Sequence, residues 1–400
     1  MYIPVKLSEN VFYVGVNDRR TTLFENIWPL EKGVAYNSYL IDDKEVALID
    51  TVESGHFDIF LKKIESILGN RSINYLIVNH VEPDHAGSLK FITKLYPDIK
   101  IVGNKKTLAM IEGYFGIKDN VIEIKECDTL NLGHNTLQFF MMPMVHWPEV
   151  MVTYLQEEKI LFSADAFGTF GTLDGGIFDD ELDFYSFEDE MRRYYSNIVG
   201  KYGNPVQSAI KKLSQIEIKM IASTHGPILR KHIADVLNWY NKWSLYDTDE
   251  GVVITYASMY GNTEEMAETI ARKIAEEGIK NIKIFDVSKT HSSYIISDIF
   301  RYKGLILGSP TYNGELHPNM ESLISKLLNM GIKNHYIGIF GSFTWAGNAA
   351  KKLNEFVIKS GCEQVGEIVE EKHSLKEEKY FACRNLGLAI ANRLKADRKI

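Results

Sequence analysis

The sequence has few cysteines, no excess of positive charge and no long hydrophobic run. Its 400 residues include three cysteines, at positions 127, 362 and 383, and these form no CxxC motif. An odd count without such spacing indicates reduced thiols in a reducing compartment. It also excludes an iron–sulfur or rubredoxin-type centre, which needs a set of cysteine ligands. Any electron carrier in this chain must therefore be organic, or be held by histidines and carboxylates.

The charge and hydropathy patterns exclude two further classes of protein. The net charge of −8 argues against nucleic-acid binding, because a phosphate-neutralising surface would make the balance basic. No apolar run is long enough to cross a bilayer, and no signal-peptide pattern follows Met1. We therefore expect a cytoplasmic protein that binds neither nucleic acid nor membrane.

The length favours two domains, each with its own core. The composition becomes polar near residues 247–251, so we expect a first domain at 1–249 and a second at 250–400. In the first, the pattern predicts an α/β/β/α sandwich, with helices at 55–68, 87–95 and 104–114. We expect its strands at 12–16, 36–41, 45–49, 75–78, 100–103, 137–142, 151–155 and 159–162. The second domain alternates strand and helix, which is typical of a doubly wound parallel sheet.

A short loop with four potential metal ligands follows the predicted strand at 75–78. It reads His80-Val-Glu-Pro-Asp-His85, and active sites of layered α/β folds usually lie where strands end in such loops. His80 and Glu82 alternate to one side of an extended segment, whereas Asp84 and His85 turn away. The loop therefore predicts two metal ions rather than one. A polar surface loop is the alternative, which four ligand-type residues in six disfavour.

Three further candidate ligands, His146, Asp165 and His225, each come shortly after a predicted strand. A lone histidine is more often structural, but several strands that end in His or Asp at one sheet edge predict a converging cluster. We therefore expect these three side chains to join those of the His80 loop.

The second domain contains a candidate phosphate-binding loop, Ser258-Met-Tyr-Gly-Asn-Thr263, between a buried strand at 252–256 and a helix at about 264–277. Backbone N–H groups at such a helix start bind anions. The loop matches neither GxxxxGK[ST] nor GxGxxG, so ATP and NAD are poorly supported. Two later loops leave their strands in the same sense. The candidate cofactor contacts are Ser258, Met259, Tyr260, Gly261, Asn262, Thr263, Pro310, Thr311, Tyr312, Asn313, Gly314, Ser342, Phe343, Thr344, Trp345, Ala346 and Gly347.

The order HxExDH, His, Asp, His resembles the metallo-β-lactamase fold, and the three-loop set resembles flavodoxin, which holds FMN at its switch point. Zinc hydrolases of the former fold usually carry a histidine where this chain has Glu82. That added carboxylate shifts the metal preference from zinc toward iron or manganese. The phosphate loop differs from the flavodoxin form at Tyr260, which replaces a threonine. Together the two halves resemble the flavodiiron proteins, or A-type flavoproteins, over essentially the whole chain.

This resemblance implies a di-iron centre and FMN, and the reduction of O2 to water or of nitric oxide to nitrous oxide, with O2 favoured. It implies that His80, Glu82 and His146 hold one iron, that Asp84, His85 and His225 hold the other, and that Asp165 bridges them. It also implies a head-to-tail homodimer, or a tetramer built from it. Because no rubredoxin or flavin-reductase domain follows in the sequence, we expect a separate electron donor such as rubredoxin or a reduced deazaflavin. A zinc hydrolase with an attached flavin module and a pure electron carrier are the alternatives.

Overall fold

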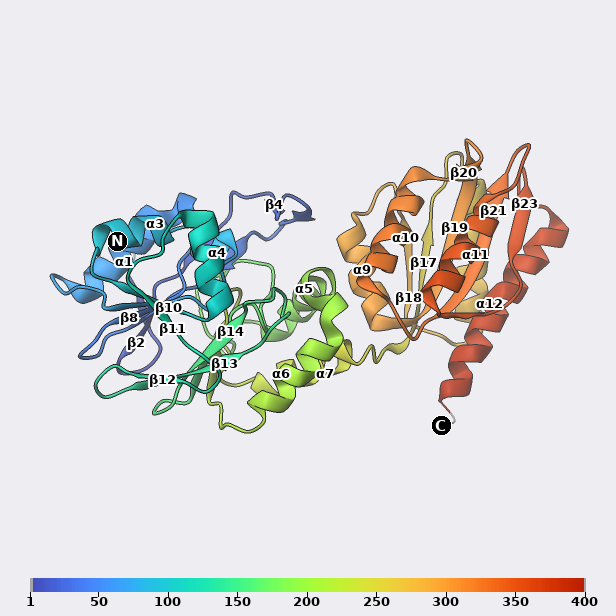
Figure 1. Cartoon of the computed structure of the whole chain (residues 1–400). Helices are drawn as coiled ribbons and strands as arrows, with labels where there is room; N and C mark the ends of the chain where they lie inside the picture. The colour runs from blue at the N-terminus through green and yellow to red at the C-terminus, as the bar shows by residue number, and fades with distance from the viewer. Residues whose placement is uncertain (1–2, 399–400) are drawn as a thin grey trace. The chain divides into compact units, whose positions relative to one another are not determined.

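The computed structural model describes residues 3–398, which divide into two compact units (Figure 1). Unit 1 runs up to Tyr195 and includes Asn204–Asn241, whereas unit 2 consists of Ser196–Gly203 and the residues from Lys242 onward. The boundary expected after residue 249 stays a prediction. The two compact units divide the chain at other positions, because residues 242–249 and the short segment Ser196–Gly203 group with the second unit.

Unit 1 is the expected α/β/β/α sandwich, in which a seven-stranded sheet faces a five-stranded sheet. Figure 1 shows α1, α3 and α4 outside the first sheet, and α6 and α7 outside the second. In spatial order the first sheet contains β1 (Val5–Lys6), β2 (Val11–Tyr13), β7 (Tyr39–Ile41), β8 (Ala47–Ile49), β9 (Tyr75–Ile77), β10 (Lys100–Gly103) and β11 (Val121–Glu123). The second contains β12 (Thr129–Asn131), β13 (Thr136–Met141), β14 (Met151–Leu155), β15 (Ile160–Phe162) and β16 (Met220–Ala222).

The helices of this half are α1 (Phe57–Leu68), α2 (Pro83–Ala86), α3 (Leu89–Leu95), α4 (Lys105–Phe115), α5 (Glu188–Tyr194), α6 (Gly203–Leu213) and α7 (Ile233–Ser244). Short helical turns of unit 1 lie at η1 (Ser54–His56) and η2 (Phe184–Phe187), whereas η3 (Tyr195–Val199) and η4 (Gly200–Tyr202) lie almost entirely in the short segment that groups with unit 2. A small hairpin, β4 (Leu23–Phe24) with β5 (Trp28–Pro29), stands apart from the two main sheets.

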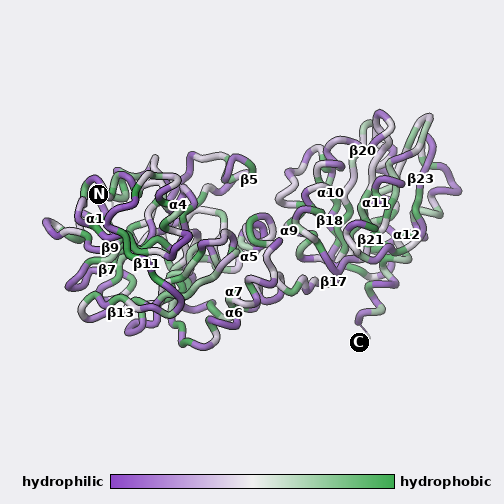
Figure 2. Tube along the Cα trace, viewed as in Figure 1, coloured by the Kyte–Doolittle hydropathy of each residue, from purple (hydrophilic) through white to green (hydrophobic). Residues whose placement is uncertain are grey.

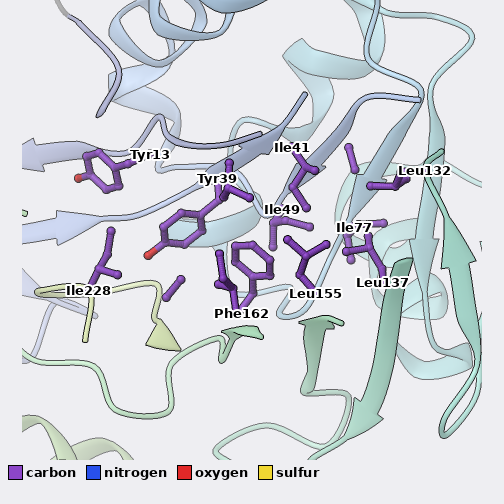
Figure 3. Packing of buried hydrophobic residues seen from close by; sticks show 14 of the residues in the cluster. Tyr13, Tyr39, Ile41, Ile49, Ile77, Leu132, Leu137, Leu155, Phe162 and Ile228 are labelled. Carbon is purple, nitrogen blue, oxygen red and sulfur yellow. The ribbon is translucent and has the colours of Figure 1, made fainter. Parts of the chain in front are cut away.

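The core of unit 1 lies between its two sheets, where Ile49 and Ile77 of the first sheet and Leu137 and Phe162 of the second belong to one buried cluster (Figure 3). Figure 2 shows that hydrophobic stretches follow strands such as β9. Burial of these side chains stabilises each by about 1.5–3 kcal/mol relative to exposure. The packed core therefore holds the strand ends that carry the candidate ligands.

Two predicted strands are each divided in the structure, so the single strands expected at 12–16 and 36–41 are wrong. In the first sheet β2 pairs with β7. The residues after β2 form β3 (Val16–Asp18), and the residues before β7 form β6 (Val34–Tyr36). These two short strands pair with each other in a separate two-stranded sheet. The break occurs where a Cβ on Gly15 would lie 2.5 Å from Tyr36 O. At the same place the Asn37 N–H donates to Thr224 O at 2.7 Å. The interruption thus ties this strand pair to the loop that carries His225.

Unit 2 is the expected doubly wound parallel sheet, with spatial order β18-β17-β19-β21-β22. The short strand β20 pairs with β19, and β23 pairs with the far part of β21. The strands are β17 (Asp249–Tyr256), β18 (Ile282–Asp286), β19 (Tyr302–Tyr312), β20 (Glu315–Leu316), β21 (Tyr336–Phe343), β22 (Glu363–Gln364) and β23 (Val369–Lys372). The helices are α8 (Asn262–Glu276), α9 (Ser292–Arg301), α10 (Pro318–Met330), α11 (Ala349–Ser360) and α12 (Glu377–Asp397). Within residues 3–398 no helix combines the length and apolar character needed to cross a membrane.

Candidate metal centre and flavin site

The segment after β9 divides its four candidate ligands between an extended stretch and a helix. Residues up to Glu82 are non-helical, and α2 begins at Pro83, which a first helical position accepts because its missing N–H would be unpaired there anyway. The second half of this segment is therefore a helical turn rather than the loop expected. This change of backbone direction sends Asp84 and His85 away from His80 and Glu82.

The first group of candidate ligands consists of His80, Glu82, His146 and Asp165, and all four are buried. The Glu82 Oε2 atom lies 3.1 Å from His80 Nε2 and 3.2 Å from His146 Nε2. The Asp165 Oδ2 atom lies 3.0 Å from His146 Nε2 and 3.5 Å from His80 Nε2. Two imidazoles and two carboxylates thus converge from three different strand ends.

The second group consists of Asp84, His85 and His225. The Asp84 Oδ2 atom lies 3.2 Å from both His85 Nε2 and His225 Nε2. The His225 Nδ1–H donates to Ala35 O at 2.8 Å, which leaves Nε2 directed at the group. Both Asp84 oxygens and the His225 Nε2 atom are buried without a hydrogen-bond partner. Buried polar atoms rarely lack a partner, and this set of oxygen and nitrogen donors fits a divalent transition metal.

Asp165 lies between the two groups and faces each with a different oxygen. Its Oδ2 atom is 3.0 Å from His146 Nε2, whereas its Oδ1 atom is 2.8 Å from His85 Nε2 and 3.7 Å from His225 Nε2. The Thr224 hydroxyl donates to Oδ1 at 2.5 Å and fixes the carboxylate. This position is the one that a bridging carboxylate would occupy.

The carboxylates and imidazoles strongly favour each other's charged forms. Burial lowers the pKa of His85, but the charges of Asp84 and Asp165 raise it more, so its pKa is about 9. Burial also lowers the pKa of His146, while its hydrogen bonds to Asp165 and Glu82 raise it to about 9. The same histidines hold the pKa of Asp165 well below its ordinary value despite burial. The field of this site therefore attracts positive charge, as a cation site requires.

Glu149 supports the first group, and sequence reasoning missed it. Its Oε1 atom lies 2.7 Å from His80 Nδ1, both side chains are fully buried, and the Val81 N–H also donates to this oxygen. A carboxylate behind a ligating histidine fixes the ring and raises its basicity. In the sequence, Glu149 is marked as a candidate for this role by nothing more than its position shortly after His146. Its actual partner is 69 residues away, so the pairing depends on the fold.

A second carboxylate that sequence reasoning missed, Glu25, comes from the turn between β4 and β5. Its Oε2 atom accepts the Trp28 Nε1–H at 2.9 Å. Loss of water around the carboxyl, together with the charge of Glu82, raises the pKa of Glu25 to about 7. Nothing in the sequence around this hairpin distinguishes Glu25 from an ordinary surface residue.

The candidate cofactor residues of unit 2 gather at the ends of three adjacent parallel strands. The helix α8 begins at Asn262, directly after Gly261, whose φ of 93° favours glycine. The Thr263 hydroxyl lies 2.8 Å from the Ser342 hydroxyl, which joins the first and third segments. The Thr311 hydroxyl accepts the N–H groups of Asn348 and Ala349, both at 3.0 Å, which joins the second and third.

Several of these residues belong to strands rather than to the loops expected. Pro310, Thr311 and Tyr312 continue β19, which forms a hairpin with β20 around Asn313 and Gly314, and Ser342 and Phe343 end β21. The prediction missed this because the strand pattern there is interrupted by proline and polar residues. The side chains of Met259, Tyr260, Tyr312 and Trp345 are exposed, Tyr260 by 89% and Trp345 by 82%. These segments thus present aromatic rings around an anion-binding helix start, an arrangement suited to a flat phosphorylated cofactor.

Comparison with known proteins agrees with both halves of the chain. The family model "ODP family beta lactamase" matches residues 34–226, and the model "Flavodoxin" matches residues 254–387. An anaerobic nitric oxide reductase flavorubredoxin of Aliivibrio salmonicida is 32% identical over 368 residues, which are 90% of this chain and 73% of that protein. The structure of rubredoxin oxygen:oxidoreductase from Desulfovibrio gigas superposes with a TM-score of 0.96 at 30% identity, over 99% of this chain and 100% of that one. The flavodiiron protein of Giardia intestinalis superposes with a TM-score of 0.93 at 26% identity, over 98% and 97% of the two chains. With a metallo-β-lactamase-like half, a flavodoxin-like half and relatives of this kind over nearly its whole length, the chain belongs to the flavodiiron protein family.

Proposed function

We propose that this protein is an oxidoreductase that reduces O2 to water, and nitric oxide to nitrous oxide less readily, with electrons from a separate donor. The observation that carries this proposal is the pair of buried ligand groups with Asp165 between them. In this proposal His80, Glu82 and His146 would hold one iron, Asp84, His85 and His225 would hold the other, and Asp165 would serve both. Such a centre would supply electrons in pairs to a diatomic molecule, and bound FMN would supply them singly or in pairs.

The side chains of unit 1 position and balance such a centre. Glu82, Asp84 and Asp165 bring three negative charges into a buried site, which two divalent cations and one hydroxide would neutralise. Glu149 and Ala35 O hold the rings of His80 and His225 through their Nδ1 atoms and so orient the Nε2 atoms. Glu82 adds a hard oxygen donor to the first group, which favours iron over zinc.

The side chains of unit 2 support FMN. We infer that the N–H groups at the start of α8 and the hydroxyls of Ser258 and Thr263 would bind its phosphate, and that the exposed rings of Tyr312 and Trp345 would lie beside its ring system. Tyr260 stands where the flavodoxin loop has a threonine, so in this proposal backbone N–H groups would compensate for the missing hydroxyl. Nearby aromatic side chains also exclude water from one face of a bound flavin.

Metal and flavin analysis of the purified protein, followed by anaerobic assays of the photoreduced protein with each gas, tests this function. About two irons and one FMN per chain, with O2 consumed faster than nitric oxide, is the expected result. Zinc without oxidase activity would instead support the hydrolase, which the comparisons do not favour, and FMN without metal would support an electron carrier. The control is the Asp165→Asn variant, which should bind FMN but reduce neither gas.

We expect a head-to-tail homodimer, in which the flavin of one chain serves the irons of its partner. Mixing two inactive variants tests this arrangement: Asp165→Asn, which lacks a working metal site, and Trp345→Asp with Thr263→Asp, which repel FMN. A mixed dimer contains one working pair of sites if electrons cross between chains, and none if they stay within a chain. Recovery of activity on mixing supports the arrangement, whereas a fully active monomer would contradict it. Rubredoxin or a reduced deazaflavin as donor, a tetramer, and a cytoplasmic location stay predictions.

A further inference from the structure

A small apolar cavity lies in unit 1 between the second sheet and the helices α6 and α7. Its volume is about 20 Å³, and its walls include Val206 and Ala209 of α6 and Tyr240 of α7. A cavity measured in this way needs roughly 10–15 Å³ to hold one water molecule. The space is therefore enough for one molecule of diatomic size.

The walls offer a water molecule nothing to bind. They expose no polar atom to the cavity, and the hydroxyl of Ser163, which lines it, donates instead to Ala166 O at 2.8 Å. Water needs two to four polar partners to occupy a buried site, and cavities lined by apolar side chains stay dry and bind xenon or benzene. This cavity is thus suited to a small apolar gas and unsuited to water.

The cavity adjoins the first ligand group through the backbone. Val145 and Ala166 line it, and they are the chain neighbours of His146 and Asp165 respectively. The wall of the cavity is therefore one residue along the chain from two candidate ligands. The His146 Nε2 atom lies 3.0 Å from the Asp165 Oδ2 atom.

The residues that line the cavity differ in their exposure to solvent. Val145, Phe167 and Val206 are 3%, 3% and 2% exposed, whereas Ala209 on the outer side of the cavity is half-buried. Solvent therefore reaches part of Ala209, one of the residues of α6 that line the cavity. Local motions of such a helix surface occur far faster than typical enzyme turnover.

We propose that this cavity is a binding site for the apolar gas substrate, which enters beside Ala209 and is held against Val145 and Ala166, the chain neighbours of His146 and Asp165. This inference rests on the proposed function, because it names where the gas waits before it reaches the metal site. It predicts that the cavity raises the local concentration of O2 or nitric oxide and so lowers KM, without contributing to the rate at saturating gas.

Xenon-pressurised crystals and gas-dependent kinetics test the proposal together. Xenon should bind in the cavity of the wild-type protein and should be displaced in Ala209→Leu, whose larger side chain fills it. The matched control is Ser208→Leu, which adds a similar apolar group at an exposed position of the same helix. We expect a several-fold rise in the KM for O2 in Ala209→Leu with kcat nearly unchanged, and wild-type values in Ser208→Leu.

Two results would overturn the proposal. The first is the absence of xenon from the wild-type cavity. The second is xenon in the wild type, displaced in Ala209→Leu, with a KM equal to that of Ser208→Leu. Iron and FMN content, measured on all three proteins, shows whether a variant has failed to fold. If Ala209→Leu fails to fold, Val206→Ala replaces it, because this change enlarges the cavity and should increase the amount of bound xenon. If wild-type protein that contains iron and FMN reduces neither gas, the proposed function fails. The xenon experiment still decides whether the cavity binds gas.

Discussion

Replacing Glu149 should weaken metal binding at one group of ligands and leave the other unchanged. Its Oε1 atom is 2.7 Å from His80 Nδ1, and both side chains are fully buried. Burial raises the pKa of Glu149, but the hydrogen bond to His80 lowers it to below its ordinary value, so this side chain acts as an anion. The second group contains no contact with Glu149 and therefore serves as a control within the same molecule.

The size of the effect follows from the type of hydrogen bond that is lost. Hydrogen bonds to charged groups contribute about 1.5–3 kcal/mol, and loss of such a partner behind a ligating histidine typically weakens metal affinity roughly 10- to 100-fold. Glu149→Gln keeps an acceptor for His80 but loses the charge, so we expect about a 10-fold loss. Glu149→Ala also leaves the Val81 N–H without its acceptor, so we expect a loss of about 100-fold.

Competition between the metal-free protein and a chelator, with the two binding steps resolved, measures both affinities. The matched control is Glu123→Gln, which removes the same charge from an exposed position of the same unit. Wild-type affinity for both metals in Glu149→Ala, or an equal loss of affinity in both binding steps, would contradict this role of Glu149. Unchanged FMN binding in all variants would show that unit 2 is intact.

Three other changes have defined outcomes. Asp165→Asn removes the charge that faces both ligand groups, so both metal-binding steps should weaken and gas reduction should fall by more than about 100-fold, as metal analysis and oxygen consumption would show. Thr263→Val removes the hydroxyl paired with Ser342 and should weaken FMN binding about fivefold, or about 1 kcal/mol, in a fluorescence titration, whereas Thr290→Val should not. Burial raises the pKa of Asp18, but hydrogen bonds from Thr21, from the N–H of Arg20 and from His56 lower it to about 2. Such a group stabilises the fold above its unfolded pKa of about 3.9, so Asp18→Asn should lower the free energy of unfolding by about 1–2 kcal/mol at pH 7. This difference should shrink as the pH falls from about 4 toward 2 in urea titrations of the metal-free protein, and an equal difference at pH 3 and pH 7 would contradict the assignment.

The sequence by itself was sufficient for the local chemistry of this protein. Strand ends that carry His146, Asp165 and His225 are recognisable because a buried strand has a run of apolar residues and a polar residue ends it. The α/β/β/α half and the parallel sheet of the second half follow from the order of strands and helices along the chain. Whether the seven candidate ligands hold iron stays a prediction, although the structure brings their side chains together.

The contacts between residues far apart in the chain could not be predicted from local patterns, because they depend on how the sheets pair and pack. The contacts of Glu149 with His80, of His225 Nδ1 with Ala35 O, and of Asn37 with the loop before His225 join residues 69, 190 and 186 positions apart. The breaks after β2 and β6, and the extension of β19 to Tyr312, likewise depend on neighbouring chain segments. Local propensity acts over a few residues, whereas the partner of a strand or of a buried carboxylate depends on how the sheets pair and pack. Sequence patterns therefore indicated what the site is made of, and packing determined how its parts face one another.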